Sequence, residues 1–326
     1  MQVVSVKKTQ KVVVLGTGGT IAGTAASASE QVAYTAAQLG VDQLTAAVPG
    51  LDKVLDGRQL LLEQLAQLDS KDMDHATWLL LARRCAHWLA QDDVGALVIT
   101  HGTDTLEETA WFLQSVLQPH KPVVMVCAMR PASSDEADGP QNLRDALVVS
   151  AQPLAAGVCV VCAGVIHSAR DVQKVHPYRL DAFSSGDVGP LGWMDRGQVQ
   201  WSAVYARTAL QTSTSANSVM TSDVDHWPAV EVVFSHAGAG RRVVDALVQA
   251  GVSGLVVAGS GNGTVHHVLQ AALKDAEQAG VRVRLSTRCI EGRIVGNSSQ
   301  WPDMAGLSPL KARISLMLEL LAESSV

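Results

Sequence analysis

The sequence lacks an apolar run long enough to cross a membrane, because no segment approaches the roughly 20 apolar residues that a spanning helix needs. It also lacks an excess of positive charge: 25 Lys and Arg against 31 Asp and Glu give a formal net charge of −6. Neither a nucleic acid nor a membrane surface is therefore an expected partner. The segment Met1 to Gln10 is too short and polar for a secretory signal. The five cysteines, odd in number and without framework spacing, indicate a reducing compartment, so we expect a cytoplasmic protein.

The composition indicates a folded chain with a large core. Hydrophobic residues make up 47% of the 326 residues and charged residues only 17%, which excludes extended disorder. Strand and helix patterns alternate from the start, and continuous apolar strands are typical of a mainly parallel sheet covered by helices. We expect an α/β fold with a larger N-terminal domain, helices on both faces of its sheet, and a smaller C-terminal α/β domain.

The expected elements are placed as follows. A Ser-, Thr- and Asn-rich stretch at residues 208–225 indicates a linker, which gives domains at 1–207 and 226–326. In the first domain the patterns predict strands at 12–15, 94–100, 122–128 and 157–166, and helices at 75–91 and 106–117. Thr105 and Glu108 fit a capping box at the start of the second helix. In the second domain they predict strands at 230–236, 254–259 and 281–286, helices at 240–250 and 264–279, and a last helix capped by Ser308 with Pro309 in its first turn.

The first strand leads into a glycine-rich loop, Gly16-Thr17-Gly18-Gly19-Thr20-Ile21-Ala22-Gly23. A dinucleotide-binding fingerprint would need its third glycine at the position of Ile21, so that reading fails. What is left is a loop with two threonines, Thr17 and Thr20, at the carboxyl end of a strand, where open α/β sheets bind their ligands.

Other polar groups follow later strands. Thr100-His101-Gly102-Thr103-Asp104-Thr105 places hydroxyls and a carboxylate at a helix N-terminus, which suits either helix capping or anion binding. Lys174, taken alone, is typical of a solvated surface charge. Cys159 and Cys162 lie inside one predicted strand with side chains on opposite faces, which favours buried thiols over a redox or zinc site.

Six motifs in register resemble the bacterial-type L-asparaginase family, and the similarity runs from about Val12 to Lys311. They are the two motifs at 16–23 and 100–105 together with the segments 125–131, 137–143, 186–192 and 259–263. The resemblance implies amide hydrolysis through a covalent acyl-threonine, with Thr20 as the nucleophile on a lid and Tyr34 contacting it. Thr103, Asp104 and Lys174 match the second triad, with Asp104 also binding the substrate ammonium. Ser70 matches the serine that holds the substrate carboxylate, and Asn262 matches a residue supplied by a neighbouring subunit.

A threonine hydroxyl needs a partner to take its proton. Tyr34 or a water relayed from Thr103 could do so, whereas Lys174 would serve only where burial disfavours its charged form. Backbone N–H groups near Thr20 and Thr103 can stabilise the oxyanion. The resemblance implies no metal or organic cofactor.

Two positions depart from the family pattern. Many members have Gln after the serine, where this chain has Lys71, and a partner-subunit glutamate would align near residues 297–300, which contain no acid. At about 4 Å and an effective dielectric constant near 20, a like charge costs about 4 kcal/mol. We therefore expect Lys71 to turn toward an acidic neighbour or the substrate carboxylate, and glutamine to be a poor substrate.

The leading function is hydrolysis of L-asparagine to L-aspartate and ammonia. The alternatives are a glutaminase-asparaginase of mixed specificity and a non-catalytic amino-acid sensor with the same fold. The resemblance also implies a homotetramer with sites at a dimer interface.

Overall fold

The computed structural model describes residues 10–30, 33–152, 157–203, 216–296 and 300–324. The chain forms two compact units, Met1–Thr212 and Ser213–Val326, each with its own sheet. Of the linker predicted at residues 208–225, residues 208–215 lie outside the described ranges, and the remainder holds two short helices. In the described part of the chain, no helix is both long and apolar enough to span a membrane.

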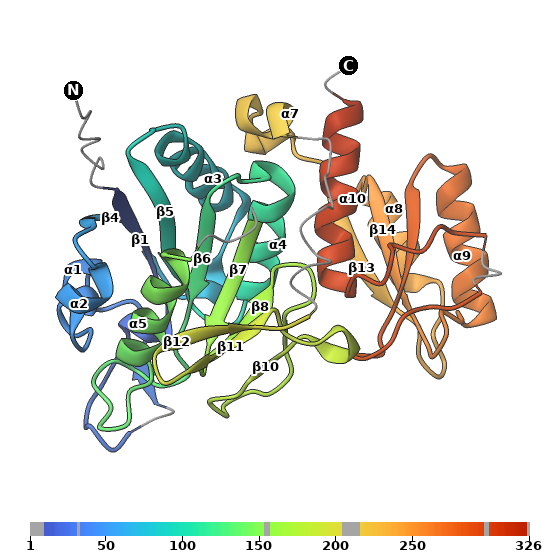
Figure 1. Ribbon diagram of the computed structural model, residues 1–326. Helices are drawn as coiled ribbons and strands as arrows, with labels where there is room; N and C mark the ends of the chain where they lie inside the picture. The colour runs from blue at the N-terminus through green and yellow to red at the C-terminus, as the bar shows by residue number, and fades with distance from the viewer. Residues whose placement is uncertain (1–9, 31–32, 153–156, 204–215, 297–299, 325–326) are drawn as a thin grey trace. The chain divides into compact units, whose positions relative to one another are not determined.

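The first unit is built on an eight-stranded sheet in the order β12-β11-β8-β7-β6-β5-β1-β4 (Figure 1). Five neighbouring strands, from β4 to β7, run parallel, and the other three pair antiparallel at the far edge. The strands are β1 (Lys11–Gly18), β4 (Gln59–Leu68), β5 (Val94–Thr100), β6 (Pro122–Val126), β7 (Gly157–Cys162), β8 (Val165–Ser168), β11 (Gly192–Asp195) and β12 (Gln198–Trp201).

Helices cover both faces of this sheet. On one face α1 (Val41–Ala46), α2 (Leu51–Leu55) and α5 (Gly139–Ser150) pack against the valines of the central strands (Figure 1). On the other face lie α3 (His75–Leu89) and α4 (Leu106–Leu117), which pack on each other and on the sheet. The predicted fold class is confirmed, because apolar strands buried on both faces need helices on both sides.

Short elements connect these layers at the carboxyl ends of the strands. They are η1 (Thr20–Ala22), β2 (Thr24–Ala25), β3 (Tyr34–Thr35), η2 (Ser70–Asp72), β9 (Gln173–Lys174), β10 (Phe183–Ser184) and η3 (Gly186–Val188). Strands β2 and β3 pair antiparallel, as do β9 and β10. These connections carry most of the residues that the sequence motifs single out.

The single strand predicted at residues 157–166 is wrong. The segment is a hairpin, in which β7 ends at Cys162 and β8 begins at Val165 and pairs antiparallel with it. Ala163 and Gly164 form the turn with φ values of 49° and 73°. Positive φ at both central residues gives the twist that a two-residue hairpin requires. The uninterrupted apolar pattern concealed this turn, because both strands are buried.

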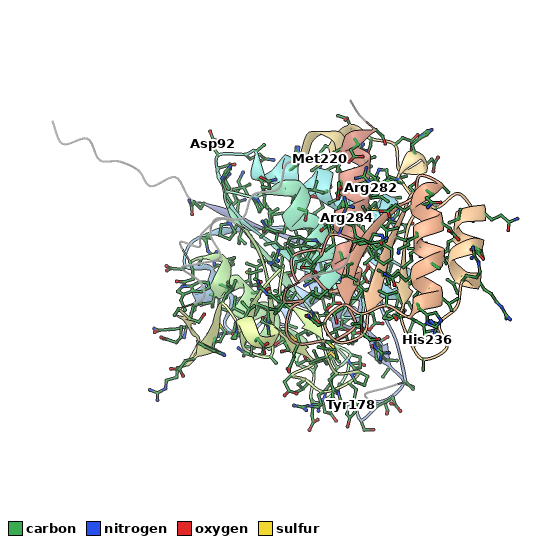
Figure 2. All side chains as sticks on the ribbon, turned by 90° about the vertical axis from the view of Figure 1, so that its right-hand side faces the viewer. Asp92, Tyr178, Met220, His236, Arg282 and Arg284 are labelled. Atoms are coloured by element: carbon green, nitrogen blue, oxygen red, sulfur yellow. The ribbon has the colours of Figure 1, made fainter. Side chains whose placement is uncertain are left out.

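The second unit has a three-stranded parallel sheet in the order β13-β14-β15. Helices α8 and α9 form a core with one face, and α10 packs on the other. Arg282 and Arg284 of β15 form ion pairs with Glu319 of α10 and lie side by side along that helix (Figure 2). The elements are α7 (Ala216–Thr221), η4 (Val224–His226), β13 (Val230–Phe234), α8 (Arg242–Gln249), β14 (Gly254–Gly259), α9 (His267–Gln278), β15 (Arg282–Thr287) and α10 (Pro309–Glu323). The cap predicted for the last helix is confirmed, since Ser308 accepts from the Lys311 N–H.

Candidate active site

Two glycines bring the first two motifs together. A Cβ built on Gly19 would lie 2.3 Å from both Cα and N of Gly102, so the two backbones are in direct contact. Gly19 has φ of 83° and ψ of −172°, a conformation that is essentially restricted to glycine. Strands β1 and β5 are adjacent and parallel, so their carboxyl ends deliver both loops to the same edge. The residues that follow these glycines, Thr20 and Thr103, are therefore held close to each other.

Thr20 begins η1 and is 6% exposed. Its Oγ1 lies 2.7 Å from the hydroxyl of Tyr34, which is placed by the β2–β3 hairpin. Burial raises the pKa of Tyr34 above 10.0, and the negative charges of Asp104 and Asp69 add to this rise against the hydrogen bond from Thr20. Tyr34 is therefore a neutral phenol at physiological pH, able to donate or accept one hydrogen bond with the threonine.

Thr103, Asp104 and Lys174 form one hydrogen-bonded cluster. Lys174 Nζ donates to Thr103 Oγ1 at 2.9 Å and to Asp104 Oδ1 at 2.6 Å. The backbone N–H of Lys174 donates to the carboxylate of Glu107 at 2.8 Å, which ties β9 to the first turn of α4. Glu107 was not singled out from the sequence, although its place in that turn two residues after Thr105 was visible there.

Ser70 contacts this cluster through Asp104. It is 2% exposed, and its Oγ accepts from the Asp104 N–H at 3.2 Å. The capping box predicted for Thr105 and Glu108 is wrong, because Thr105 makes no side-chain cap bond. Its hydroxyl instead donates to the carbonyl of Ser70 at 2.8 Å, so a tertiary contact takes the place of the local cap.

Lys71 turns toward acidic neighbours. Its Nζ lies 2.7 Å from Asp69 and 3.3 Å from Asp72, and these hydrogen bonds raise the pKa of the Lys71 ammonium. The side chain is 61% exposed. Of the two orientations expected from the sequence, the structure has the one toward neighbouring carboxylates, which offset the charge of the lysine.

His101 was not proposed as a functional residue from the sequence. It is fully buried, and desolvation lowers its pKa from 6.5 to about 4. Its Nδ1 lies 2.7 Å from the carbonyl oxygen of Gly102, so Nδ1 carries the proton of a neutral ring. This bond fixes the peptide group between Gly102 and Thr103. Its place in the motif at residues 100–105 was the available signal.

A second buried network supports the loop after β6. The carboxylate of Asp138 accepts from the N–H groups of Met129 and Arg130, each at 3.0 Å. Asn142 donates to the same carboxylate and to the carbonyl of Cys127. These contacts join the family-like segments 125–131 and 137–143 to each other, so both segments have a structural function.

Asn262 belongs to the second unit and is held within that unit. Its amide donates to Val295 O and accepts from Val295 N, both at 2.7 Å. Of the segment that would align with the partner-subunit glutamate, residues 297–299 lie outside the described ranges.

The other residues considered from the sequence, Thr17 and the cysteines, have structural positions. Thr17 is 2% exposed and donates to the Thr100 carbonyl, so it joins β1 to β5. All five cysteines are free thiols, four of them buried. Among the described residues, no three His, Cys, Asp or Glu side chains are arranged to hold a metal ion.

Comparison with known proteins covers nearly the whole chain. Residues 11–206 match the family "Asparaginase, N-terminal" and residues 229–325 match "Glutaminase/Asparaginase C-terminal domain". The glutaminase-asparaginase of Pseudomonas fluorescens biotype A is 37% identical over 96% of this chain and 87% of its own length. L-asparaginase 2 of Escherichia coli (strain K12) is 37% identical over 95% of this chain and 88% of its own length.

A solved structure gives the same result. The probable cytoplasmic L-asparaginase from Campylobacter jejuni superposes with a TM-score of 0.85 at 37% identity, covering 95% of both chains. The resemblance inferred from six motifs is thus confirmed over both units. The chain belongs to the glutaminase/asparaginase family.

Proposed function

We propose that this protein hydrolyses L-asparagine to L-aspartate and ammonia, with Thr20 as the nucleophile. The observation that carries the proposal is the contact between Gly19 and Gly102, which holds Thr20 beside the cluster of Thr103, Asp104 and Lys174. Family membership and the similarity to proteins named L-asparaginase support the same reaction.

The reaction has two halves. Thr20 Oγ1 attacks the side-chain amide carbon, the C–N bond breaks, and the nitrogen leaves as ammonia carrying the threonine proton. Water then hydrolyses the acyl-threonine ester, which gives aspartate and returns a proton to Thr20. Within the described residues, the N–H groups of Thr20 and Thr103 have no hydrogen-bond acceptor, so they are available to the oxyanion.

The raised pKa of Tyr34 bears on the choice of base. A neutral phenol cannot take the proton unless it passes on its own, and burial disfavours the phenolate. A water between Thr20 and Thr103 is the better acceptor of the Thr20 proton. Lys174 donates to Thr103 Oγ1, and the Thr103 hydroxyl proton can turn toward Asp104. The oxygen of Thr103 is then left to accept a hydrogen bond from that water. Tyr34 then orients the Thr20 hydroxyl.

Substrate binding uses the groups around Ser70. The buried Ser70 hydroxyl suits the substrate α-carboxylate, and Asp104, whose side chain is 53% exposed, suits the α-ammonium. Because Lys71 is paired with Asp69 and Asp72, it places little uncompensated charge on the bound amine. We propose that glutamine is a poorer substrate than asparagine. The similarity to proteins named glutaminase-asparaginase keeps mixed specificity as the second candidate.

Assembly and location complete the proposal. We propose a homotetramer in which Asn262 serves the site of a neighbouring subunit, with its amide held in place by Val295. Five free thiols favour the reducing cytoplasm.

Ammonia release from L-asparagine and L-glutamine tests the function directly. We expect turnover of asparagine by the parent, and loss of turnover in folded Thr20→Ala and Thr103→Ala variants. Mass spectrometry after trapping with a reactive asparagine analogue should place the label on Thr20. Parent-level ammonia release by both variants would remove Thr20 from the mechanism, and aspartate binding without any turnover would favour a sensor.

A further inference from the structure

A cavity of about 370 Å³ lies at the edge of the first unit's sheet where the parallel strands β1, β5 and β6 begin. This is the edge opposite to the one that carries Thr20 and Thr103. Because β5 has seven residues, the two edges are separated by about 20 Å of strand. Four basic residues line the cavity, Lys11, Arg58, His120 and Lys121, and none of the described lining residues is acidic.

Arg58 is fixed in the wall of this cavity. Its guanidinium carries five N–H donors. Four of them are used, one on Ser150 Oγ at 3.0 Å and three on the backbone carbonyls of Val54, Leu55 and Leu147. Burial lowers the pKa of Arg58, and the negative charge of Asp56 opposes this shift. One N–H on Nη1 is left over, on a group that has little freedom to move.

Lys121 is held in the same way. Its Nζ donates to the carbonyls of Leu89 and Gln91 at 2.8 and 2.7 Å, at the C-terminal end of α3. An ammonium has three donors, so one remains. Within the described residues, neither Arg58 nor Lys121 forms an ion pair with a carboxylate, whereas Lys11 is paired with Asp93 at 2.7 Å.

We propose that this cavity, hereafter the basal cavity, binds a small oxyanion, a phosphate or carboxylate group, between Arg58 and Lys121. Both cations are positioned before the ligand arrives, so little side-chain entropy is lost on binding. Each keeps one donor for a charge-assisted hydrogen bond. The volume lies at the lower end of the range for small-molecule sites, which suits a small anion rather than a polymer.

Inorganic phosphate and malonate are the probes, and they are titrated into the whole protein by calorimetry at constant ionic strength. Chloride, an anion that is not an oxyanion, is the control. Each titration is repeated with Ser70→Ala, which removes the hydroxyl proposed for the substrate carboxylate, so that anion binding at the candidate active site is recognised. We expect saturable binding of at least one probe, and the comparison of the two tells whether the site prefers phosphate or carboxylate.

Two variants locate the site. Lys121→Met removes one cation, and Ser150→Asp gives Arg58 a carboxylate partner inside the cavity, so that folding does not depend on deleting a buried charge. Each should weaken binding by roughly tenfold or more, the effect of losing one charge-assisted hydrogen bond. Lys274→Met, which removes an exposed lysine of α9, is the matched control and should bind like the parent.

The outcome does not depend on the catalytic proposal, because no residue of the basal cavity belongs to the candidate active site. Absence of saturable binding by both probes overturns the inference. It is equally overturned by binding that Lys121→Met and Ser150→Asp leave unchanged, or by binding that only Ser70→Ala weakens.

Discussion

Replacing Gly19 with alanine should leave a folded protein that has lost most of its activity. The added Cβ would lie 2.3 Å from Gly102 Cα, and real Cβ contacts essentially never fall below 3.0 Å. The two loops must therefore separate by about 0.7 Å or more, since both neighbouring groups are backbone. Thr20 and Thr103 follow these glycines directly, so the separation moves the nucleophile away from its partner cluster.

The expected magnitude has two parts. An alanine at φ of 83° and ψ of −172° costs about 1–3 kcal/mol of backbone strain, and the forced contact costs about 1–3 kcal/mol more. A misplacement near 1 Å at a reacting centre can lower the rate by about 100-fold, so we expect kcat to fall by that order while KM changes less.

Gly50→Ala is the matched control. Gly50 also has a positive φ, 65°, but nothing lies within 4 Å of its added Cβ. This variant should lose about 1 kcal/mol of stability and keep its activity. Steady-state kinetics on L-asparagine, with urea unfolding of both variants, measures the two effects separately. A folded Gly19→Ala enzyme with parent kinetics would refute the argument that this backbone contact assembles the site.

Four further outcomes follow from the same structure. Lys174→Met should lower kcat by about 10²–10⁴, because Thr103 then loses its donor and Asp104 its counter-charge, and stopped-time ammonia assays measure this. Lys71→Gln leaves Asp69 and Asp72 without their counter-charge, so it should change the ratio of kcat/KM for asparagine and glutamine; unchanged kinetics on both amides would remove Lys71 from the specificity argument. Between pH 6.5 and about 4 the unfolded chain binds a proton at His101 that the folded chain does not. The free energy of unfolding should therefore fall by up to about 3 kcal/mol as the pH is lowered through this range. Urea unfolding measures this dependence on pH, and His101→Asn should make it weaker. Mixing inactive Thr20→Ala and Asn262→Ala chains, with subunit exchange, should restore about a quarter of parent activity if sites are shared, and none if they are not.

Local sequence rules were sufficient where an element is defined by its own residues. Strand β5 and helix α4 have the predicted bounds, and Ser308 caps the last helix as predicted. The apolar strand followed by glycines and threonines also predicted the loop that follows β1, at the carboxyl end of a strand that pairs in parallel with β5. In each case burial or capping depends on residues a few positions apart.

The sequence was insufficient where a structural feature depends on contacts with another segment of the chain. Strand β4 was not predicted, because its burial alternates only weakly and its register is set by β1. The turn at Ala163 and Gly164 has no polar residue, so only the antiparallel pairing of β7 and β8 reveals it. For His101, neither its burial nor its hydrogen bond to the Gly102 carbonyl can be inferred from the sequence pattern.

The failed capping prediction explains how the site is assembled. The hydroxyl of a threonine at an N-cap normally accepts a hydrogen bond from a backbone N–H in the first turn of its own helix. In this chain Thr105 donates to the carbonyl of Ser70, while the Asp104 N–H donates to the Ser70 hydroxyl. These two hydrogen bonds clamp the β4–α3 connection to the start of α4, so the proposed carboxylate-binding serine and the proposed ammonium-binding aspartate are fixed relative to each other. The Thr105 hydroxyl thus bonds a residue 35 positions away instead of capping its own helix. This contact helps to set the distance between Ser70 and Asp104, which the carboxylate and ammonium of an amino-acid substrate would have to match.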